Sequence, residues 1–122
     1  MKKLLFFLVL MAALASCGNN YKAKSVVEKF LDDNLVNPDC EVRCLGLKST
    51  NKISADVVRH LQEQAAAGDS LFKHPLPYAA FSTTDTLYYE RVTIIHHADT
   101  FVRTVYLLPS LEDGCVVAVK EN

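Results

Sequence analysis

Several features that mark common functional classes are missing from this chain of 122 residues. Tryptophan is absent, and the sequence contains neither an internal repeat nor a low-complexity tract. It has no basic stripe that would neutralise phosphates, which argues against a nucleic-acid partner. It also lacks a nucleophile elbow, a Ser/His/Asp grouping, a phosphate-binding glycine loop and a structural zinc spacing. The sequence therefore predicts no catalytic residue, no cofactor and no metal site.

The longest apolar run stands at the beginning of the chain. It covers the 12 residues from Leu4 to Ala15 and follows two lysines, Lys2 and Lys3. A membrane-spanning helix needs about 20 apolar residues, so this run is too short for a permanent transmembrane segment. A positive start followed by a short apolar run is typical of a secretory signal.

The end of this signal carries a specific motif. Leu14-Ala15-Ser16-Cys17 resembles the bacterial lipobox, in which an aliphatic residue and two small residues precede a cysteine. The resemblance implies that residues 1–16 are removed and that the Cys17 thiolate takes a lipid group. Several acyl chains on one residue would anchor the protein stably, whereas one chain binds only reversibly. The alternative is an ordinary secretory signal with a chance cysteine at its cleavage site.

The lipobox predicts where the protein is located in the cell and how its chain is divided into segments. The mature form would run from Cys17 to Asn122 and would be anchored to the inner or outer membrane of a bacterial cell envelope, with its domain outside the cytoplasm. Residues 18–20 form a short polar tether, and residues 21–122 form one domain of common size. Without Lys2 and Lys3, 11 basic residues face 14 acidic ones, so the net charge becomes −3.

Three cysteines remain once Cys17 is acylated: Cys40, Cys44 and Cys115. If residues 40–44 are extended, Cys40 and Cys44 are about 13 Å apart, too far for a disulfide. Cys44 and Cys115 on neighbouring strands are then the better candidate pair. The alternative is that all three are small buried hydrophobic residues.

Hydrophobic periodicity predicts two helices and four strands. Apolar residues recur every three to four positions in both predicted helices, and the period changes to two in the strands. The expected ranges are helix 21–35, strand 41–48, helix 55–67 and strands 86–96, 100–108 and 115–119. This order predicts an α+β fold: an antiparallel sheet of about four strands, one between the helices and three in a meander. The sheet should pack on the long N-terminal helix, with helices covering one face. We expect the apolar loop 69–85 to close one end of the core.

One group of sequence features is similar to a known class of proteins. The segment Val27–Leu31, then Asn34-Leu35 and Asn37-Pro38-Asp39 before a strand, resembles small uncharacterised bacterial lipoproteins. Together with the lipobox, these residues make up about a third of the chain. The closing segment Val116–Asn122 also resembles these lipoproteins. The resemblance implies a cystatin-like or nuclear-transport-factor-like fold, in which a curved antiparallel sheet wraps a long N-terminal helix. It implies no catalytic residue.

Two histidines are adjacent where the predicted strand 86–96 meets the predicted hairpin turn 97–99. Neighbouring side chains on a strand point to opposite faces, so His96 and His97 should not bind one metal ion together. A metal site would need one of them together with Cys40, His74 or Cys115.

The same strand carries a candidate ligand pocket. Tyr89 and Arg91 share one face of the strand with Thr93, and an arginine in an apolar pocket holds anionic groups well. The alternative is that Arg91 pairs with an acid such as Glu41 or lies at the rim.

Three functional hypotheses remain open from the sequence. The first is a non-enzymatic envelope module that binds a protein or small ligand through its sheet face or through the loop 69–85. The second is an enzyme with a small-molecule pocket in a cone-shaped α+β fold, using Arg91 or a histidine as its polar group. The third is a cystatin-like protease inhibitor that presents its loops as a wedge.

Overall fold

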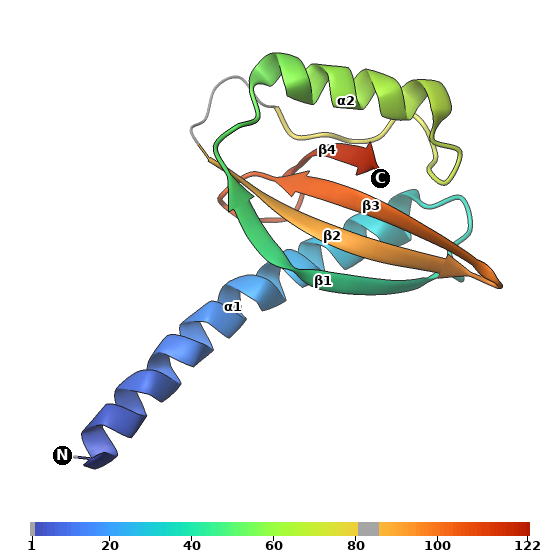
Figure 1. Cartoon of the computed structure of the whole chain (residues 1–122). Coiled ribbons are helices and arrows are strands. Elements are labelled where there is room, and N and C mark those ends of the chain that lie inside the picture. The colour runs from blue at the N-terminus through green and yellow to red at the C-terminus, as the bar shows by residue number, and fades with distance from the viewer. Residues whose placement is uncertain (1, 81–85) are drawn as a thin grey trace.

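The protein is α+β, with two helices and one four-stranded antiparallel sheet (Figure 1). The computed structural model describes residues 2–80 and 86–122, with side chains from residue 18 onward in these ranges. The elements in chain order are α1 (Lys2–Asn34), β1 (Glu41–Thr50), α2 (Ala55–Gly68), β2 (Leu87–His96), β3 (Asp99–Leu107) and β4 (Val116–Glu121). The strands lie in the order β1-β2-β3-β4, which confirms the predicted antiparallel meander. Across the described residues, no helix has both the length and the apolar character needed to span a bilayer.

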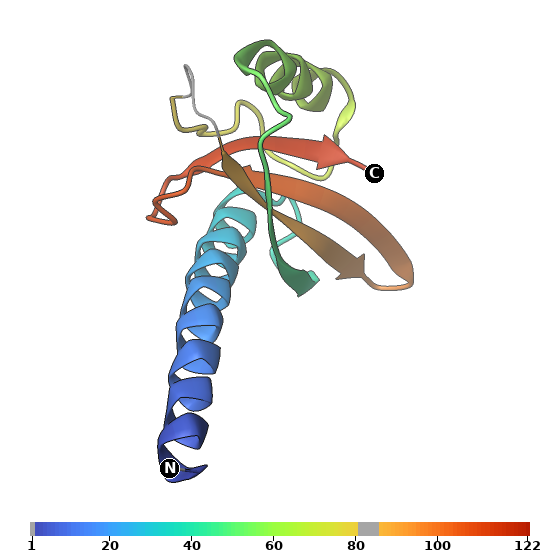
Figure 2. The same ribbon diagram turned by 60° about the vertical axis from the view of Figure 1, so that its left-hand side comes forward.

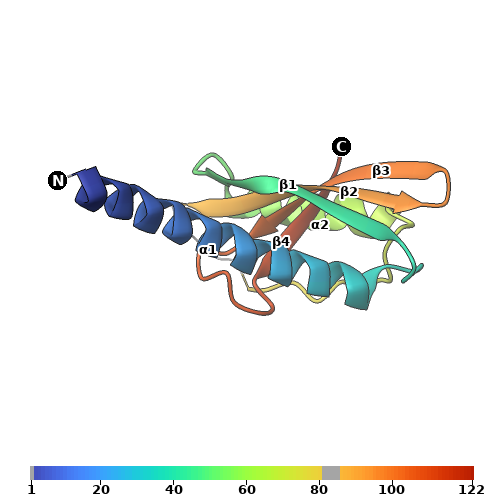
Figure 3. The ribbon, with the colours of Figure 1, turned by 90° about the horizontal axis from the view of Figure 1, so that it is seen from below.

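The two helices lie on opposite faces of the sheet, as Figures 2 and 3 show. One hydrophobic cluster joins α1 to alternate residues of β2 and β3, among them Val92 and Val105. A second cluster joins α2 to residues on the other face, including Tyr106 and Val117. The prediction that helices cover one face of the sheet is therefore wrong. The hydrophobic periodicity of a helix indicates which of its faces is apolar. It does not indicate which face of the sheet the helix packs against.

Helix α1 packs through one apolar stripe. Its side chains at helical spacing are at most 7% exposed and form the centre of the larger cluster with Leu35, which directly follows the helix; they are Ala23, Val26, Val27, Phe30 and Leu31. Lysines and acids fill the opposite, solvated face. The Asn34 side-chain amide donates to the Phe30 carbonyl at 2.8 Å where the helix ends. Pro38 follows closely and disfavours helical geometry in the residue before it.

Helix α2 begins at a serine cap. The Ser54 hydroxyl accepts a hydrogen bond from the Val57 amide at 3.3 Å, which satisfies one of the free donors of the first turn. Val58 and Leu61 bury the inner face against β3 and β4. The Gln62 side chain donates to the Val117 carbonyl at 2.6 Å and so ties the helix directly to β4.

The chain after α2 closes one end of the core, as the sequence predicts for the loop 69–85. Phe72 and Leu76 are buried in the cluster that α1 forms with the sheet. The Lys73 amide donates to the Asn34 carbonyl at 2.8 Å, so this segment also covers the end of α1. The last five residues of the predicted loop, 81–85, lie outside the described residues.

Candidate functional site

A bulge in β1 prepares a small hollow on the sheet face that α2 occupies. Cys44 pairs with Val92 and Leu47 pairs with Glu90, so Leu45 and Gly46 together oppose Arg91. Gly46 has a φ of 121°, a left-handed backbone conformation that side chains with a Cβ rarely adopt. The bulge therefore reverses the alternation of side chains in the second half of β1.

This reversal departs from the strict alternation of side chains that a regular strand would show. Strict alternation would place Leu47 with Arg43 and Leu45. Instead, Leu47 packs into the core under α1, and Lys48 opposes Tyr89 on the other face. A glycine inside a strand pattern is the local signal of such a bulge, so Gly46 could have revealed this arrangement in the sequence.

The hollow contains both residues of the predicted ligand pocket. It has a volume of about 220 Å³ and is lined by Leu45, Gly46, Lys48, Tyr89 and Arg91. Tyr89 and Arg91 come from β2, while the bulge brings the other three from the edge strand β1. Helix α2 lies over β4, at the other edge of the sheet, and leaves this part of the face open (Figure 1).

The two cations of the hollow have no counter-charge among the described residues. Neither Arg91 nor Lys48 forms an ion pair or a side-chain hydrogen bond there. Glu41, the expected partner of Arg91, instead accepts from Arg43 Nε at 3.1 Å. The hollow is thus a basic recess beside an aromatic ring, and its unpaired guanidinium is available for a carboxylate or a phosphate.

Tyr89 connects the hollow to the core. Its ring centroid lies 6.0 Å from that of Tyr106 on β3. Burial raises the pKa of Tyr106, the neighbouring Tyr89 raises it further, and the Arg91 cation opposes the rise. The raised pKa keeps the Tyr106 hydroxyl neutral, and Lys48 and Arg91 carry the charge of the hollow.

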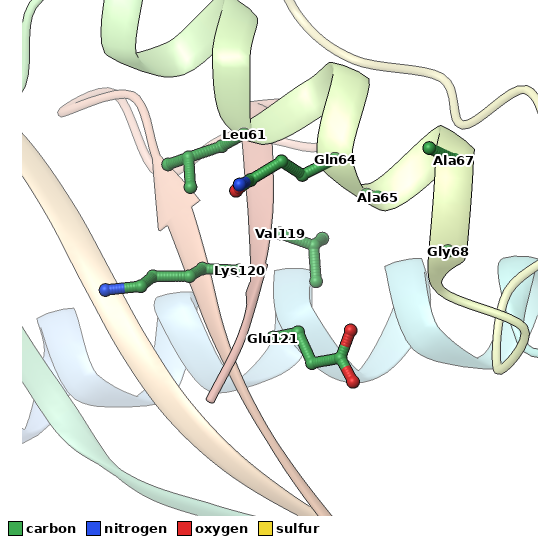
Figure 4. Close-up of a pocket in the computed structure, with 8 residues that line it drawn as sticks. All are labelled: Leu61, Gln64, Ala65, Ala67, Gly68, Val119, Lys120 and Glu121. Atoms are coloured by element: carbon green, nitrogen blue, oxygen red, sulfur yellow. The ribbon is translucent and has the colours of Figure 1, made fainter.

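A second, wider hollow of about 470 Å³ lies between α2 and β4 (Figure 4). Its apolar wall comes from Leu61, Ala65 and Val119, and Gln64 and Glu121 stand at its rim. Lys120 also lines this hollow and forms no ion pair with Glu121 in the described part of the chain, and the hollow lies apart from the predicted Tyr89–Arg91 pocket.

The cysteines do not lie as the sequence argument assumed. Cys40, Cys44 and Cys115 are free in the structure. Cys44 is on β1 and Cys115 immediately precedes β4, so the full width of the sheet separates their strands. The assumption that Cys44 and Cys115 lie on neighbouring strands is therefore wrong. Burial, reinforced by Glu90, raises the pKa of Cys44 to about 12, which keeps its thiol protonated at neutral pH.

The structure also corrects the reading of the two histidines. His97 has a φ of 54° in the turn between β2 and β3, and its ring centroid lies 4.2 Å from that of His96. The prediction that the rings face opposite sides is wrong, because the left-handed turn residue leaves the strand alternation. Asp39 lies beside them, whereas His74 Nε2 is 2.8 Å from the carbonyl oxygen of Asp69.

The predicted acylation residue, Cys17, belongs to α1, but its side chain lies outside the described part of the structure. Its lipidation therefore stays a prediction. The polar tether predicted for residues 18–20 is helical in the structure. Asn20 Oδ1 accepts a hydrogen bond from the Leu47 amide at 3.1 Å, so α1 contacts β1 within one turn of Cys17.

Comparison with known proteins gives no assignment: no protein-family model, no curated protein and no solved structure matches this chain. The geometry of its own residues must carry any functional argument.

Proposed function

We propose that this protein is a lipid-anchored module of the bacterial cell envelope that binds phosphate or carboxylate groups on the open part of its sheet. The observation that carries the binding proposal is the hollow at the β1 bulge. There Arg91 and Lys48 lie beside Tyr89 without a counter-charge among the described residues. An Arg guanidinium supplies parallel donors that match a carboxylate or a phosphate, and an ammonium adds a point charge.

The size of the hollow suits a single anionic group. Pockets for drug-sized ligands have volumes of roughly 300–1,000 Å³, and this hollow has about 220 Å³. A head group or side chain that projects from a larger partner fits such a recess. Leu45, which is 60% exposed at its rim, offers apolar contact to the rest of that partner.

The anchor supports a ligand at the membrane surface. Asn20 already bonds to Leu47 beside the bulge, and Cys17 precedes it by three residues of helix α1. Three residues correspond to about 4.5 Å along a helix axis. Acyl chains on Cys17 would therefore hold this end of the domain, with the hollow, near the phosphate groups of the bilayer.

The core supports a binding module over an enzyme. The space between α1 and the sheet is filled by buried apolar side chains, and neither the hollow at the β1 bulge nor the one between α2 and β4 is lined by a serine, threonine, cysteine or histidine. An enzyme of the cone-shaped class would need an enclosed cavity with such groups. The helix-first order and the antiparallel meander are compatible with the cystatin-like resemblance, which we retain as a proposal about fold.

Replacing Cys17 with serine tests the anchor. We expect Cys17→Ser protein to move from the membrane fraction to the soluble fraction of the cells, because its hydroxyl is too poor a nucleophile to receive the lipid. Fractionation and mass spectrometry of the mature N-terminus measure this change. Cys40→Ser is the matched control and should stay in the membrane. If Cys17→Ser remains membrane-bound, the lipoprotein assignment fails.

Phosphate binding tests the hollow. With the acylated protein in zwitterionic nanodiscs, we expect inorganic phosphate to shift the side-chain NMR signals of Arg91 and Lys48. The double variant Lys48→Glu/Arg91→Glu should weaken this binding at least about tenfold, because charged hydrogen bonds contribute about 1.5–3 kcal/mol each. Nanodiscs that contain anionic lipid distinguish a head group from free phosphate. If head groups occupy the hollow there, added phosphate should no longer shift the NMR signals of Arg91 and Lys48.

A charge-matched variant controls for general electrostatics. Arg59 on α2 and Lys73 after α2 are exposed and lie outside the hollow. The variant Arg59→Glu/Lys73→Glu changes the net charge by the same amount and should bind phosphate like the wild type. Equal weakening in both double variants would contradict a specific site at the bulge.

A further inference from the structure

One corner of the sheet brings together three metal-ligating side chains from two distant segments. Glu41, the first residue of β1, pairs with Ile95 near the end of β2. The antiparallel pairing therefore carries Asp39, two residues before β1, alongside the β2–β3 turn. Asp39 Oδ1 lies 3.5 Å from His96 Nε2.

The turn adds the third side chain. His96 pairs with Asp99 at the end of the hairpin, so His97 and Ala98 form the two-residue turn. The left-handed φ of His97 takes its side chain out of the strand alternation and places its ring beside that of His96. Side chains that a regular strand would separate are thus on one side of the hairpin.

We propose that Asp39, His96 and His97 form a binding site for a divalent transition metal, with Zn²⁺ as the reference ion. One donor atom from each residue lies within 4.8 Å of the other two. Bonds of about 2.0–2.1 Å in a tetrahedral site place donor atoms roughly 3.4 Å apart. Asp39 and His97 are exposed, so their side chains can rotate to close this gap without disturbing the core.

The donor set fits this class of metal. Two imidazole nitrogens and one carboxylate oxygen suit Zn²⁺, Ni²⁺ and Cu²⁺ better than Mg²⁺ or Ca²⁺, which prefer oxygen ligands. Three protein ligands leave one position of a tetrahedral ion open to water or to a group from a partner. Neighbouring Cys40 packs against the hydrophobic core and is not in the donor cluster.

Metal titration of the full-length acylated protein in detergent micelles tests this site. We expect Zn²⁺ to bind with a one-to-one stoichiometry by calorimetry and to shift the imidazole NMR signals of His96 and His97. Losing even an outer-sphere partner of a metal ligand costs 10–100-fold in affinity. Each of His96→Ala, His97→Ala and Asp39→Ala should therefore weaken binding by at least about tenfold.

Two controls separate this site from other metal binding. His60, an exposed histidine on α2, provides the matched variant His60→Ala, which should bind Zn²⁺ like the wild type. Co²⁺ should give a visible spectrum without the sulfur-to-cobalt charge-transfer band that a cysteine ligand produces. Unchanged affinity in His96→Ala and His97→Ala, a thiolate band, or the absence of saturable binding would each overturn the proposal.

Discussion

Replacing Arg103 with leucine should destabilise the fold by about 3–5 kcal/mol, the usual cost of leaving one member of a buried ion pair without its partner. Arg103 on β3 donates to both carboxylate oxygens of Asp69, through Nε at 2.8 Å and through a terminal nitrogen at 3.0 Å. The two side chains are only 7% and 2% exposed. In Arg103→Leu, the Asp69 carboxylate stays buried without its counter-charge.

The Asp69–Arg103 pair connects the end of α2 to the sheet. The Leu71 amide also donates to Asp69 Oδ1 at 3.3 Å, and Arg103 donates to the Val102 carbonyl at 2.9 Å. Glu121 lies 3.9 Å from Arg103 and is mostly exposed, so the loss of this second ion pair adds little to the cost of Arg103→Leu. Urea unfolding of the protein in micelles, followed by circular dichroism, measures the expected loss.

An exposed pair of the same chemistry serves as the control. Arg59 donates to Asp56 at 2.9 Å, but these side chains are 70% and 85% exposed. Solvent screens such a pair, so Arg59→Leu should cost less than about 1 kcal/mol. If Arg103→Leu costs no more than Arg59→Leu, burial does not give the Asp69–Arg103 pair its importance.

Replacing Glu90 with glutamine should stabilise the protein at pH 8 by about 1–3 kcal/mol, because the variant removes a carboxylate charge that is buried without an ion pair among the described residues. Glu90 is 2% exposed beneath α1. Its Oε1 accepts from the Gly46 amide at 3.1 Å, while Oε2 has no hydrogen-bond partner in the described structure. Glutamine keeps the bond to Gly46 and removes the buried charge.

The pH dependence of this effect follows from the pKa of Glu90. Burial raises that pKa above its usual value of 4.5, while the Gly46 hydrogen bond and Lys24 lower it less. The folded carboxyl group therefore holds its proton more tightly than the unfolded one. This group favours folding below its unfolded pKa, and that contribution is lost as the pH rises through its folded pKa. The advantage of Glu90→Gln should thus be present at pH 8 and should vanish near pH 4.

Glu28 provides the control for this pH profile. It lies on the same side of the sheet, on α1, and pairs with Lys24 at 3.9 Å, but its side chain is 47% exposed. Glu28→Gln should change the free energy of unfolding by well under 1 kcal/mol, because solvent screens its exposed charge. A Glu90→Gln protein that is no more stable than the wild type at pH 8 would show that the buried carboxylate costs little.

The local elements follow from the sequence because their causes are local. The apolar stripe of α1, the Ser54 cap of α2 and the period of two in β2 and β3 each depend on residues close together in the chain. Turn residues then separate the strands, and short connections make β2, β3 and β4 antiparallel neighbours. These facts were sufficient to predict the α+β class and the four-stranded antiparallel sheet.

The predicted ligand pocket followed from the sequence only in part. Tyr89 and Arg91 share a face because strand side chains alternate, and this needs no tertiary information. Lys48 joins them only because the Gly46 bulge shifts the register between β1 and β2. A single inserted residue in one strand moves every following side chain to the other face.

By itself, the sequence determined the helices, the strands, the antiparallel class of the sheet and the candidate anchor at Cys17, because each depends on the pattern of adjacent residues. Only the tertiary structure decided which face α2 covers, how far Cys44 lies from Cys115, and which residues meet at Asp39 and Arg103. The contacts at Asp39 and Arg103 join segments that are 34 or more residues apart in the sequence, as Asp69 and Arg103 are. They depend on strand order, register and a left-handed turn residue, none of which the local hydrophobic pattern encodes.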